Sequence, residues 1–306
     1  MSPLQNIFPN PTKFYIPPNT PHRIPYEDSL PTSPTSSPSG VALFLPGMGD
    51  FRHSFRFIAP KFASELDYRC LVADMRGAGP EAQDPKGGNY GFFECVSDAL
   101  GILDQEGVKE PVTFVVNSFC AAVALHIAIE HPARVKAIVG LAGFFRPASG
   151  IFASVMPIIL PLVVNSYTHT IWLTYYKKLF ISHPPADLPS YISAMDKIYS
   201  SDPNKSRVLN ALLKSAPQCG PTWAKVAECK APVLVVVGEK DPDWPDAVKE
   251  GKEVFGKLTG SVGKEIVVFE GVGHYPHVEL PERTFEVAKA FLERVDRGGV
   301  VEEKEP

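Results

Sequence analysis

From residue 41 to about residue 295, short runs of β-branched and other apolar residues alternate with longer segments whose apolar positions recur at helical spacing. This alternation is typical of a mainly parallel central sheet flanked by helices, an α/β fold. It predicts strands at residues 41–45, 69–73, 112–116, 136–141, 233–237 and 265–269. It predicts helices at residues 51–66, 92–105, 119–130, 245–258 and 281–294.

The alternation stops between about residues 143 and 229, a stretch too long for a loop and without a clear strand pattern. Helical patches at residues 190–199 and 208–214 favour an inserted helical cap. We therefore divide the chain into a proline-rich N-terminal arm (1–39), a core (40–145 and 226–297), a cap (146–225) and a charged C-terminal tail (298–306). We expect the arm to be an extended linker, of which residues 14–16 could dock on the core.

Composition narrows the classes of partner. The 306 residues are 44% hydrophobic and 21% charged, with a formal net charge of -4, which is ordinary for a globular protein with one large core. Because no broad basic surface is implied, nucleic acid and anionic membranes are disfavoured as partners, and an apolar small molecule is favoured. The sequence does not specify an oligomeric state.

The most apolar segment and the cysteines indicate whether the chain crosses a membrane and in which compartment it is found. Residues 151–164 are too few to cross a bilayer and contain two prolines, so we expect no membrane span. No secretory signal pattern opens the chain, and the cysteines are odd in number and lack zinc-site spacing, which indicates reduced core residues in the cytoplasm. The five are Cys70, Cys95, Cys120, Cys219 and Cys229.

Candidate catalytic residues follow four of the predicted strands. Ser118 lies at the bend between the strand at 112–116 and an alanine-rich helix, and a glycine-rich turn follows the first strand. Asp241 and His274 follow the last two strands. Ligands of such sheets collect beyond the carboxyl ends of the strands, so these positions can hold a nucleophile, an orienting acid and a base. This chemistry requires no cofactor and no metal.

The motifs at these positions resemble the α/β-hydrolase superfamily over residues 41–295. They are LPGMGD at 45–50, DMRGAG at 74–79 and GH at 273–274, in the family's order of Ser, Asp and His. Within it, the chain looks most like the capped esterase, lactonase and metal-free haloperoxidase-like branch. Val116 and Cys120 stand where the family's G-x-S-x-G has glycines, so Val116 must point away from the crossing helix.

The resemblance implies acyl transfer in which His274 takes the Ser118 proton, Asp241 orients His274, and an acyl-enzyme is released by water. It also implies an oxyanion hole built from the backbone N–H groups of Met48 and Phe119. The apolar cap implies a lipophilic substrate. Candidate substrate contacts are Gly47, His53, Met156, Trp172, Tyr175 and His277.

Several nearby residues compete for these roles. Glu239, Asp243 and Asp246 are alternatives to Asp241, although they could instead stabilise the start of the next helix, and His277 is an alternative to His274. We expect His53 to be a solvated loop histidine. The remaining polar candidates are expected to be structural, with helix-packing or helix-end roles for His126 and His131 and a turn held by Asp74 and Arg76.

Three functions fit these residues. The first is a serine hydrolase of carboxylic esters or lactones of moderately large apolar molecules. The second is the same fold catalysing carbon–carbon bond hydrolysis, metal-free perhydrolysis, or a cyclisation or elimination step. The third is a ligand-binding protein without turnover.

Overall fold

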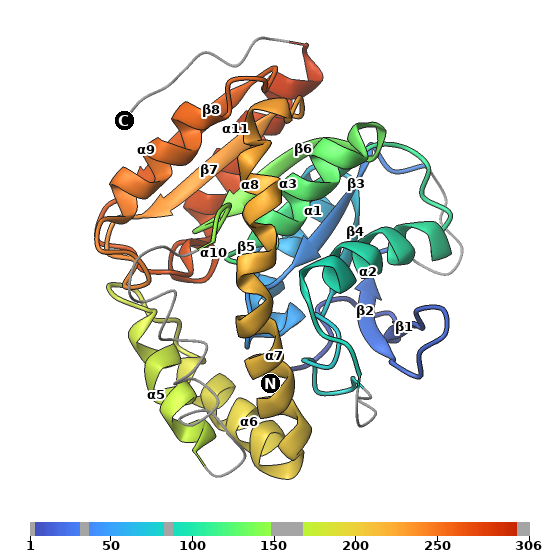
Figure 1. Cartoon of the computed structure of the whole chain (residues 1–306), viewed down its shortest axis with the longest axis vertical. Helices are drawn as coiled ribbons and strands as arrows, with labels where there is room; N and C mark the ends of the chain where they lie inside the picture. The colour runs from blue at the N-terminus through green and yellow to red at the C-terminus, as the bar shows by residue number, and fades with distance from the viewer. Residues whose placement is uncertain (1–3, 31–36, 83–87, 148–167, 299–306) are drawn as a thin grey trace.

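The computed structural model describes residues 4–30, 37–82, 88–147 and 168–298. A single eight-stranded sheet forms its centre, with the strand order β1-β2-β4-β3-β5-β6-β7-β8 (Figure 1). Strands β3 to β8 run parallel, whereas β1 and β2 run antiparallel at one edge. The parallel strands are β3 (Gly40–Leu45), β4 (Tyr68–Ala73), β5 (Val112–Asn117), β6 (Val135–Leu141), β7 (Val233–Gly238) and β8 (Lys264–Phe269), which confirms the six predicted strands.

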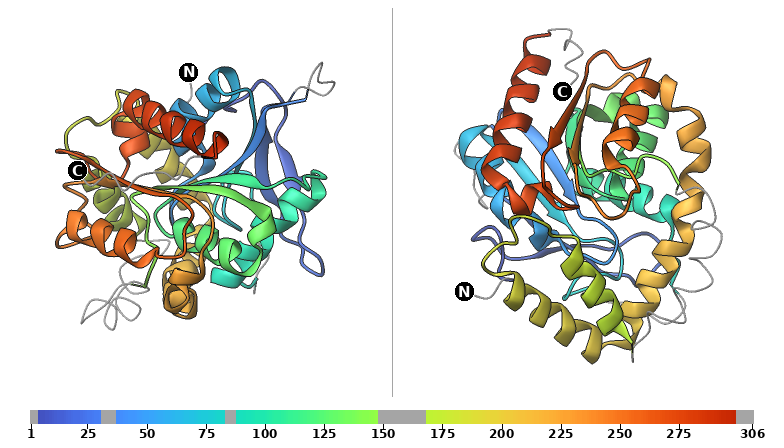
Figure 2. Two further views of the ribbon diagram at one scale, coloured as in Figure 1. Left: turned by 90° about the horizontal axis from the view of Figure 1, so that it is seen from above. Right: turned by 90° about the vertical axis from the view of Figure 1, so that its left-hand side faces the viewer.

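Helices cover both faces of the sheet, as Figure 2 shows from above. On one face α2 (Phe92–Gln105), α3 (Cys120–Glu130) and α9 (Ala247–Lys257) enclose a core that includes Phe114 and Val235. On the other, α1 (Ala59–Glu65) and α11 (Pro281–Asp296) pack over Phe44 and Val139. Burial on both faces explains why the strands are almost continuously apolar.

The helix predicted at residues 51–66 is instead two elements, the 3-10 helix η1 (Arg52–Phe57) and α1. Pro60 lies in the first turn of α1, where its missing N–H is tolerated, and it could not sit inside one continuous helix without breaking a hydrogen bond. The break lets η1 turn towards the end of the sheet. The other helices begin and end within two residues of the predicted bounds.

The expectation of an extended linker over residues 1–39 is wrong for residues 24–28, which form a strand, whereas the docking considered for residues 14–16 agrees with a short strand that includes residues 14 and 15. β1 (Lys13–Tyr15) and β2 (Ile24–Asp28) extend the sheet, and β2 pairs with β4 along its length. Every residue of β2 is buried, including Glu27 and Asp28. Their charges hid the strand from a hydrophobicity pattern, because the cations that neutralise them lie far away in the sequence.

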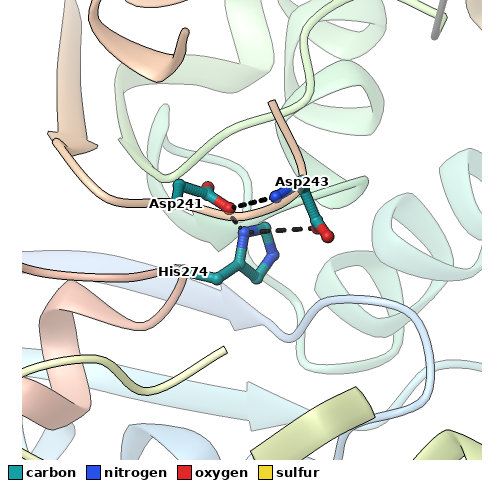
Figure 3. Close-up of side chains that lie close together, drawn as sticks. All are labelled: Asp241, Asp243 and His274. Atoms are coloured by element: carbon teal, nitrogen blue, oxygen red, sulfur yellow. Dashed lines mark hydrogen bonds and ion pairs between the residues drawn. The ribbon is translucent and has the colours of Figure 1, made fainter. Parts of the chain in front are cut away.

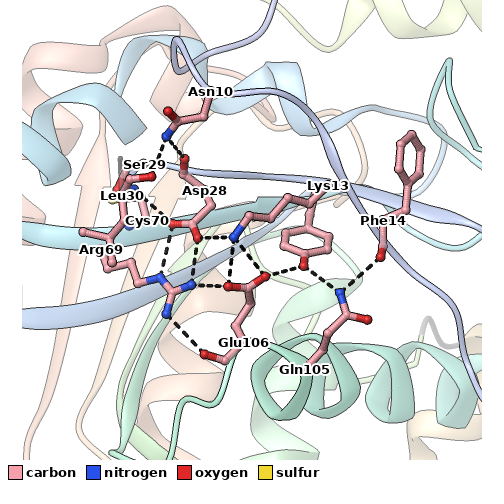
Figure 4. A network of polar contacts seen from close by, with 11 residues as sticks. Asn10, Lys13, Phe14, Asp28, Ser29, Leu30, Arg69, Cys70, Gln105 and Glu106 are labelled. Carbon is pink, nitrogen blue, oxygen red and sulfur yellow. Dashed lines mark hydrogen bonds and ion pairs between the residues drawn. The ribbon is translucent and has the colours of Figure 1, made fainter. Parts of the chain in front are cut away.

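Figure 4 shows one of these ionic networks, which joins β1, β2, β4 and the end of α2. Asp28 receives hydrogen bonds from Lys13 (2.8 Å) and Arg69 (2.7 Å), and both cations also bind Glu106. Burial raises the pKa of Asp28, but the hydrogen bonds from Arg69 and Lys13 outweigh burial and lower it below 3.8. The network therefore fixes the N-terminal hairpin to the sheet in its charged form.

A second ionic cluster surrounds the fully buried side chain of Arg52 and reaches the surface at Glu81. The Arg52 guanidinium binds Glu27 at 2.8 Å, Asp74 at 2.6 Å and Glu81 at 2.6 Å. Asp74 also accepts the backbone N–H of Arg52, and Arg76 forms a separate bidentate pair with Asp98. Asp74 and Arg76 thus hold a turn, as predicted, and all five cysteines are buried and unpaired.

The helical insertion between β6 and β7 lies at one end of the sheet (Figure 1). Its described helices are α5 (His169–Lys178), α6 (Leu188–Ser201), α7 (Pro203–Ser215), η3 (Ala216–Cys219), α8 (Gly220–Ala224) and η4 (Val226–Glu228). α5, α6 and one side of α7 pack through a third, largely aromatic cluster that includes Phe51, Tyr176 and Tyr275. The other side of α7, η3, α8 and η4 pack on the core beside α2 and α3. None of the helices in the described ranges is long and apolar enough to cross a membrane.

The ionic network of the hairpin leads to a stability prediction. Arg69→Met keeps much of the aliphatic stem but leaves the buried Asp28 with Lys13 alone, so we expect a loss of about 3 kcal/mol in the free energy of unfolding at pH 7, measured by urea denaturation. Because the folded pKa of Asp28 is lowered, its contribution is present above the unfolded pKa and disappears as the pH falls through the folded value. The difference in the free energy of unfolding between the variant and wild type should therefore become smaller as the pH falls.

The matched control is Arg297→Ala, which removes an exposed arginine whose pair with Glu293 lies within one helix end. Such exposed pairs contribute at most about 0.5 kcal/mol. A loss in Arg69→Met no larger than that of the control would show that the hairpin is not held by this network.

Candidate active site

Ser118 occupies a sharp turn between β5 and α3. Its backbone has a φ of 54°, in the left-handed region that non-glycine residues rarely adopt. The turn is held by Ser118 N donating to Leu141 O (3.2 Å) and by Phe144 N donating to Ser118 O (2.9 Å). The predicted bend is therefore present, and the Ser118 side chain is placed at the carboxyl edge of the sheet. Val116 and Cys120, which replace the expected glycines, are buried in the core beneath it.

The glycine-rich turn after β3 lies directly against this serine. A Cβ atom built on Gly47 would lie 2.9 Å from Ser118 Cβ and 2.9 Å from Asn117 Oδ1, so only glycine fits there. Gly47 is followed in the chain by Met48, and Ser118 is followed by Phe119, so the backbone N–H groups of Met48 and Phe119 come directly after the two residues in contact. In the ranges that the structure describes, neither N–H donates a hydrogen bond to a protein acceptor. Both remain available to a ligand at Ser118.

Asp241 and His274 form a close pair at the ends of β7 and β8, as Figure 3 shows. His274 Nδ1 lies 2.7 Å from Asp241 Oδ2, and both side chains are buried. Asp241 Oδ1 accepts the backbone N–H of Asp243 at 3.0 Å, which fixes the carboxylate. Asp241 is therefore the acid that meets the histidine, while Asp246 accepts Lys249 N at the start of α9 and Glu239 accepts Gly271 N.

A second carboxylate faces the same imidazole. Asp243 Oδ2 lies 3.5 Å from His274 Nδ1, and Asp243 accepts a hydrogen bond from the Tyr175 hydroxyl of α5. Burial lowers the pKa of His274, but the charges of Asp241 and Asp243 outweigh burial and raise it to about 9. Burial raises the pKa of Asp243. Asp243 was considered from the sequence only as an alternative to Asp241, whereas the structure places both carboxylates near His274 Nδ1.

Donor atoms of Asp241, Asp243 and His274 lie within 4.8 Å of one another, so the group can be compared with a metal centre. A metal ion could bind His274 Nδ1 only if this nitrogen lost the proton that it shares with Asp241. The 2.7 Å separation is that of a charge-assisted hydrogen bond. We interpret the three residues as a hydrogen-bonded acid–base group.

The loop that carries His274 contacts the loop that carries Ser118. Asn117 Nδ2 donates to the His274 backbone carbonyl at 3.3 Å, and the Phe144 ring lies 5.9 Å from the imidazole. Within the described part of the chain, no hydrogen bond joins the Ser118 hydroxyl to the His274 imidazole. Catalytic contacts in free enzymes are often long and tighten when substrate binds.

The helical insertion also contacts the site, through α5. The Trp172 ring covers Gly49, where an added Cβ would lie 2.4 Å from Trp172 Cζ2, and Tyr175 reaches Asp243. His274 N donates to Leu179 O at 2.8 Å, a backbone contact without any signal in the sequence. Two of the proposed substrate contacts therefore lie beside the site, whereas Met156 lies outside the described residues.

Two histidines that the sequence suggested as substrate contacts, His53 and His277, are packed inside the protein. His53 is not a solvated loop residue, because its imidazole is fully buried, with Nε2 3.9 Å from Glu27 Oε1. His277, in α10 (Pro276–Glu279), is fully buried and stacks on Phe55 at 5.0 Å. Burial lowers the pKa of each to about 3, so both are neutral. His274, not His277, meets the carboxylates. His126 bonds to Thr222 and His131 ends α3, so both have structural roles.

Among known proteins, the chain aligns with a lipase, Lipase 1 of Psychrobacter immobilis, at 27% identity over 81% of this chain and 75% of the lipase. Epoxide hydrolase 1 of Siraitia grosvenorii is 36% identical over 37% of this chain. The aligned part spans only about a third (35%) of that plant enzyme.

Solved structures show the same fold. A thermophilic esterase from Thermogutta terrifontis superposes with a TM-score of 0.74 at 18% identity, covering 94% of this chain and 99% of the esterase. An enol-lactonase from Burkholderia xenovorans superposes with a TM-score of 0.70 at 16% identity, covering 89% of this chain and 97% of the lactonase. The model of the alpha/beta hydrolase family matches residues 42–287. With this match and the site geometry above, the chain belongs to the alpha/beta hydrolase family.

Proposed function

We propose that the protein is a serine hydrolase that cleaves a carboxylic ester or lactone of a moderately large apolar small molecule. The observation that supports this most is the buried Asp241–His274 pair at the same sheet edge as Ser118, whose backbone is held in a strained left-handed turn. The family provides the precedent for such an arrangement. The lipase, esterase and lactonase among the similar proteins agree with ester chemistry.

In the proposed mechanism, His274 accepts the Ser118 proton at Nε2 while Ser118 Oγ attacks the carbonyl carbon. The C=O π pair moves to oxygen, and collapse of the tetrahedral intermediate expels the alcohol, which takes the proton from His274. Water then attacks the acyl-enzyme by the same path and releases the acid and Ser118. Asp241 holds Nδ1, which leaves Nε2 to act as the base towards Ser118.

The developing oxyanion would be bound by the N–H groups of Met48 and Phe119. Their hydrogens lack protein acceptors in the described ranges, and the tight Gly47–Ser118 contact holds the two loops together. Preorganised donors of this kind stabilise the transition state more than the substrate, because the charge appears only during attack. Gly47 is then required for close approach and does not itself need to bind substrate.

The helical insertion would act as the cap over the substrate. The face of α5 that turns towards the catalytic residues carries Trp172, which lies against Gly49, and Tyr175, which bonds to Asp243. These aromatic side chains would form an apolar wall of the substrate site. The five buried, unpaired cysteines support a reducing compartment such as the cytosol.

Replacement of the nucleophile tests the proposal. A fluorophosphonate probe should label wild type and should not label Ser118→Ala, and turnover of aryl esters by the variant should fall by on the order of 10³-fold or more. Mass spectrometry of the labelled peptide locates the adduct. Ser190→Ala is the matched control, because Ser190 is an exposed residue of α6 whose loss should change neither readout.

Labelling that persists in Ser118→Ala would refute the assignment of Ser118. Labelling of wild type without turnover of any ester would instead favour carbon–carbon hydrolysis, perhydrolysis or a cyclisation or elimination on the same fold. Thermal stabilisation by a ligand that is bound but not consumed, with no labelling, would favour a ligand-binding protein.

The raised pKa of His274 predicts a pH dependence. The base must be neutral to accept the Ser118 proton, so kcat/KM for an aryl ester should rise with pH through about 9, with only about 1% of the enzyme active at pH 7. Asp243→Asn removes one of the three negative charges that raise this pKa, those of Asp241, Asp243 and Asp50, and should shift the rise to lower pH by about one unit or more.

Asp246→Asn is the control for this experiment, since asparagine also caps a helix start and Asp246 does not contact His274. Its pH profile should match wild type. NMR titration of His274 in both variants gives the same pKa without any substrate. An unchanged titration in Asp243→Asn would contradict a role of Asp243 in setting the charge of His274.

A further inference from the structure

Asp50, at the end of the glycine-rich turn, is a fully buried carboxylate that the mechanism above does not use. In the ranges that the structure describes, no lysine or arginine lies within ion-pair distance of it. Its oxygens instead accept three hydrogen bonds, from Phe51 N (2.7 Å), Tyr191 Oη (2.6 Å) and Tyr176 Oη (3.0 Å). Burial raises the pKa of Asp50 and outweighs these hydrogen bonds and the charge of the more distant Arg56. Because burying such a group is unfavourable, stability of the fold does not explain this arrangement.

The two tyrosines come from different helices of the insertion, Tyr176 from α5 and Tyr191 from α6. Their rings lie 6.3 Å apart and nearly parallel, and Tyr176 also lies 5.4 Å from Tyr275, the neighbour of His274. A carboxylate accepts hydrogen bonds only, which matches two hydroxyl donors. Asp50 is thus the point where the glycine-rich turn meets both helices.

The position of Asp50 bears on the oxyanion donor proposed above. Asp50 N donates to Gly47 O at 3.3 Å, which closes the turn around Met48, and Gly47 itself packs against Ser118. A shift of Asp50 would therefore move the Met48 N–H relative to Ser118 Oγ. Donors to an oxyanion act only when they are held within a fraction of an ångström of the productive geometry.

We propose that Asp50 is a positioning residue, which holds the Met48 N–H in place because Tyr176 and Tyr191 of the helical insertion fix its carboxylate. This deepens the proposed function and rests on it. The insertion then contributes to catalysis itself, in addition to lining the substrate site. Tyr176 and Tyr191 act through Asp50 and need not touch the substrate.

Removal of the two hydroxyls tests this. The double variant Tyr176→Phe with Tyr191→Phe keeps both rings, and we expect kcat for an aryl ester to fall about tenfold to a hundredfold while KM stays within about twofold. Each single variant should show a smaller loss of the same kind. Tyr199→Phe is the matched control, because Tyr199 is buried in the same aromatic cluster on α6 but does not bond to Asp50, and its kcat should stay within about twofold of wild type.

Hydrogen exchange provides a readout that needs no activity. The Asp50 and Phe51 amides are bonded within the turn, so they should exchange about tenfold or more faster in the double variant than in wild type or Tyr199→Phe. Faster exchange with wild-type kcat would overturn the coupling to catalysis, and unchanged exchange would overturn the positioning itself. Faster exchange in a protein that hydrolyses no ester would support the positioning while refuting the proposed function.

If the double variant does not fold, the two single variants carry the same test, since each removes one oxygen atom from a packed ring. Melting temperatures of all variants separate a folding defect from a catalytic one. A kcat loss in Tyr199→Phe equal to that of the single variants would show that the aromatic cluster as a whole, rather than Asp50, supports the site, and would overturn the proposal.

Discussion

The backbone of Ser118 is the constraint on which the site depends. A serine in the left-handed region costs about 1–3 kcal/mol, and such strain persists only where its surroundings determine it. Here the end of β6 does so, since Leu141 O and Phe144 N bond to the Ser118 backbone on either side. The turn ends β5 abruptly and leaves the hydroxyl at the edge of the sheet. Because Gly47 lacks a side chain, a second loop can approach that hydroxyl closely enough to offer it backbone donors.

Buried carboxylates stabilise the arrangement in two different ways. Glu27 and Asp74 share the guanidinium of Arg52, and this cluster holds the N-terminal hairpin and the turn after β4 in place at full burial. Asp50 has no such cation and is bonded by tyrosine hydroxyls instead. The guanidinium fork of Arg52 aligns several carboxylates at once through directional N–H groups. Hydroxyl donors also require alignment, so they define the position of a loop, which suits a turn that carries a catalytic donor.

The sequence predicts the parts of this structure whose causes are local. Strands that are buried on both faces are apolar throughout, and residues that follow their carboxyl ends, such as Ser118 and His274, must meet at one edge. Glu27 and Asp28 escaped prediction because their burial depends on arginines that follow much later in the chain. The burial of His53 was missed because it depends on the packing of η1 against β4 and α10, which follow later in the chain. Asp243 could be suspected from its spacing, but its approach to His274 depends on the path of the loop and on Tyr175 from the insertion.

The insertion is bonded to the base loop through main-chain atoms, which limits how substrate can reach Ser118. His274 N donates to Leu179 O at the end of α5, and Glu279 accepts the N–H groups of the next residues of the insertion, Ile181, Ser182 and His183. The same carboxylate accepts Gly273 N at 2.7 Å. Lifting the end of α5 would break these bonds together and release the loop that holds His274. A substrate must therefore enter without displacing this end of α5, so differences in substrate preference are expected from side chains that α5 presents and not from its movement.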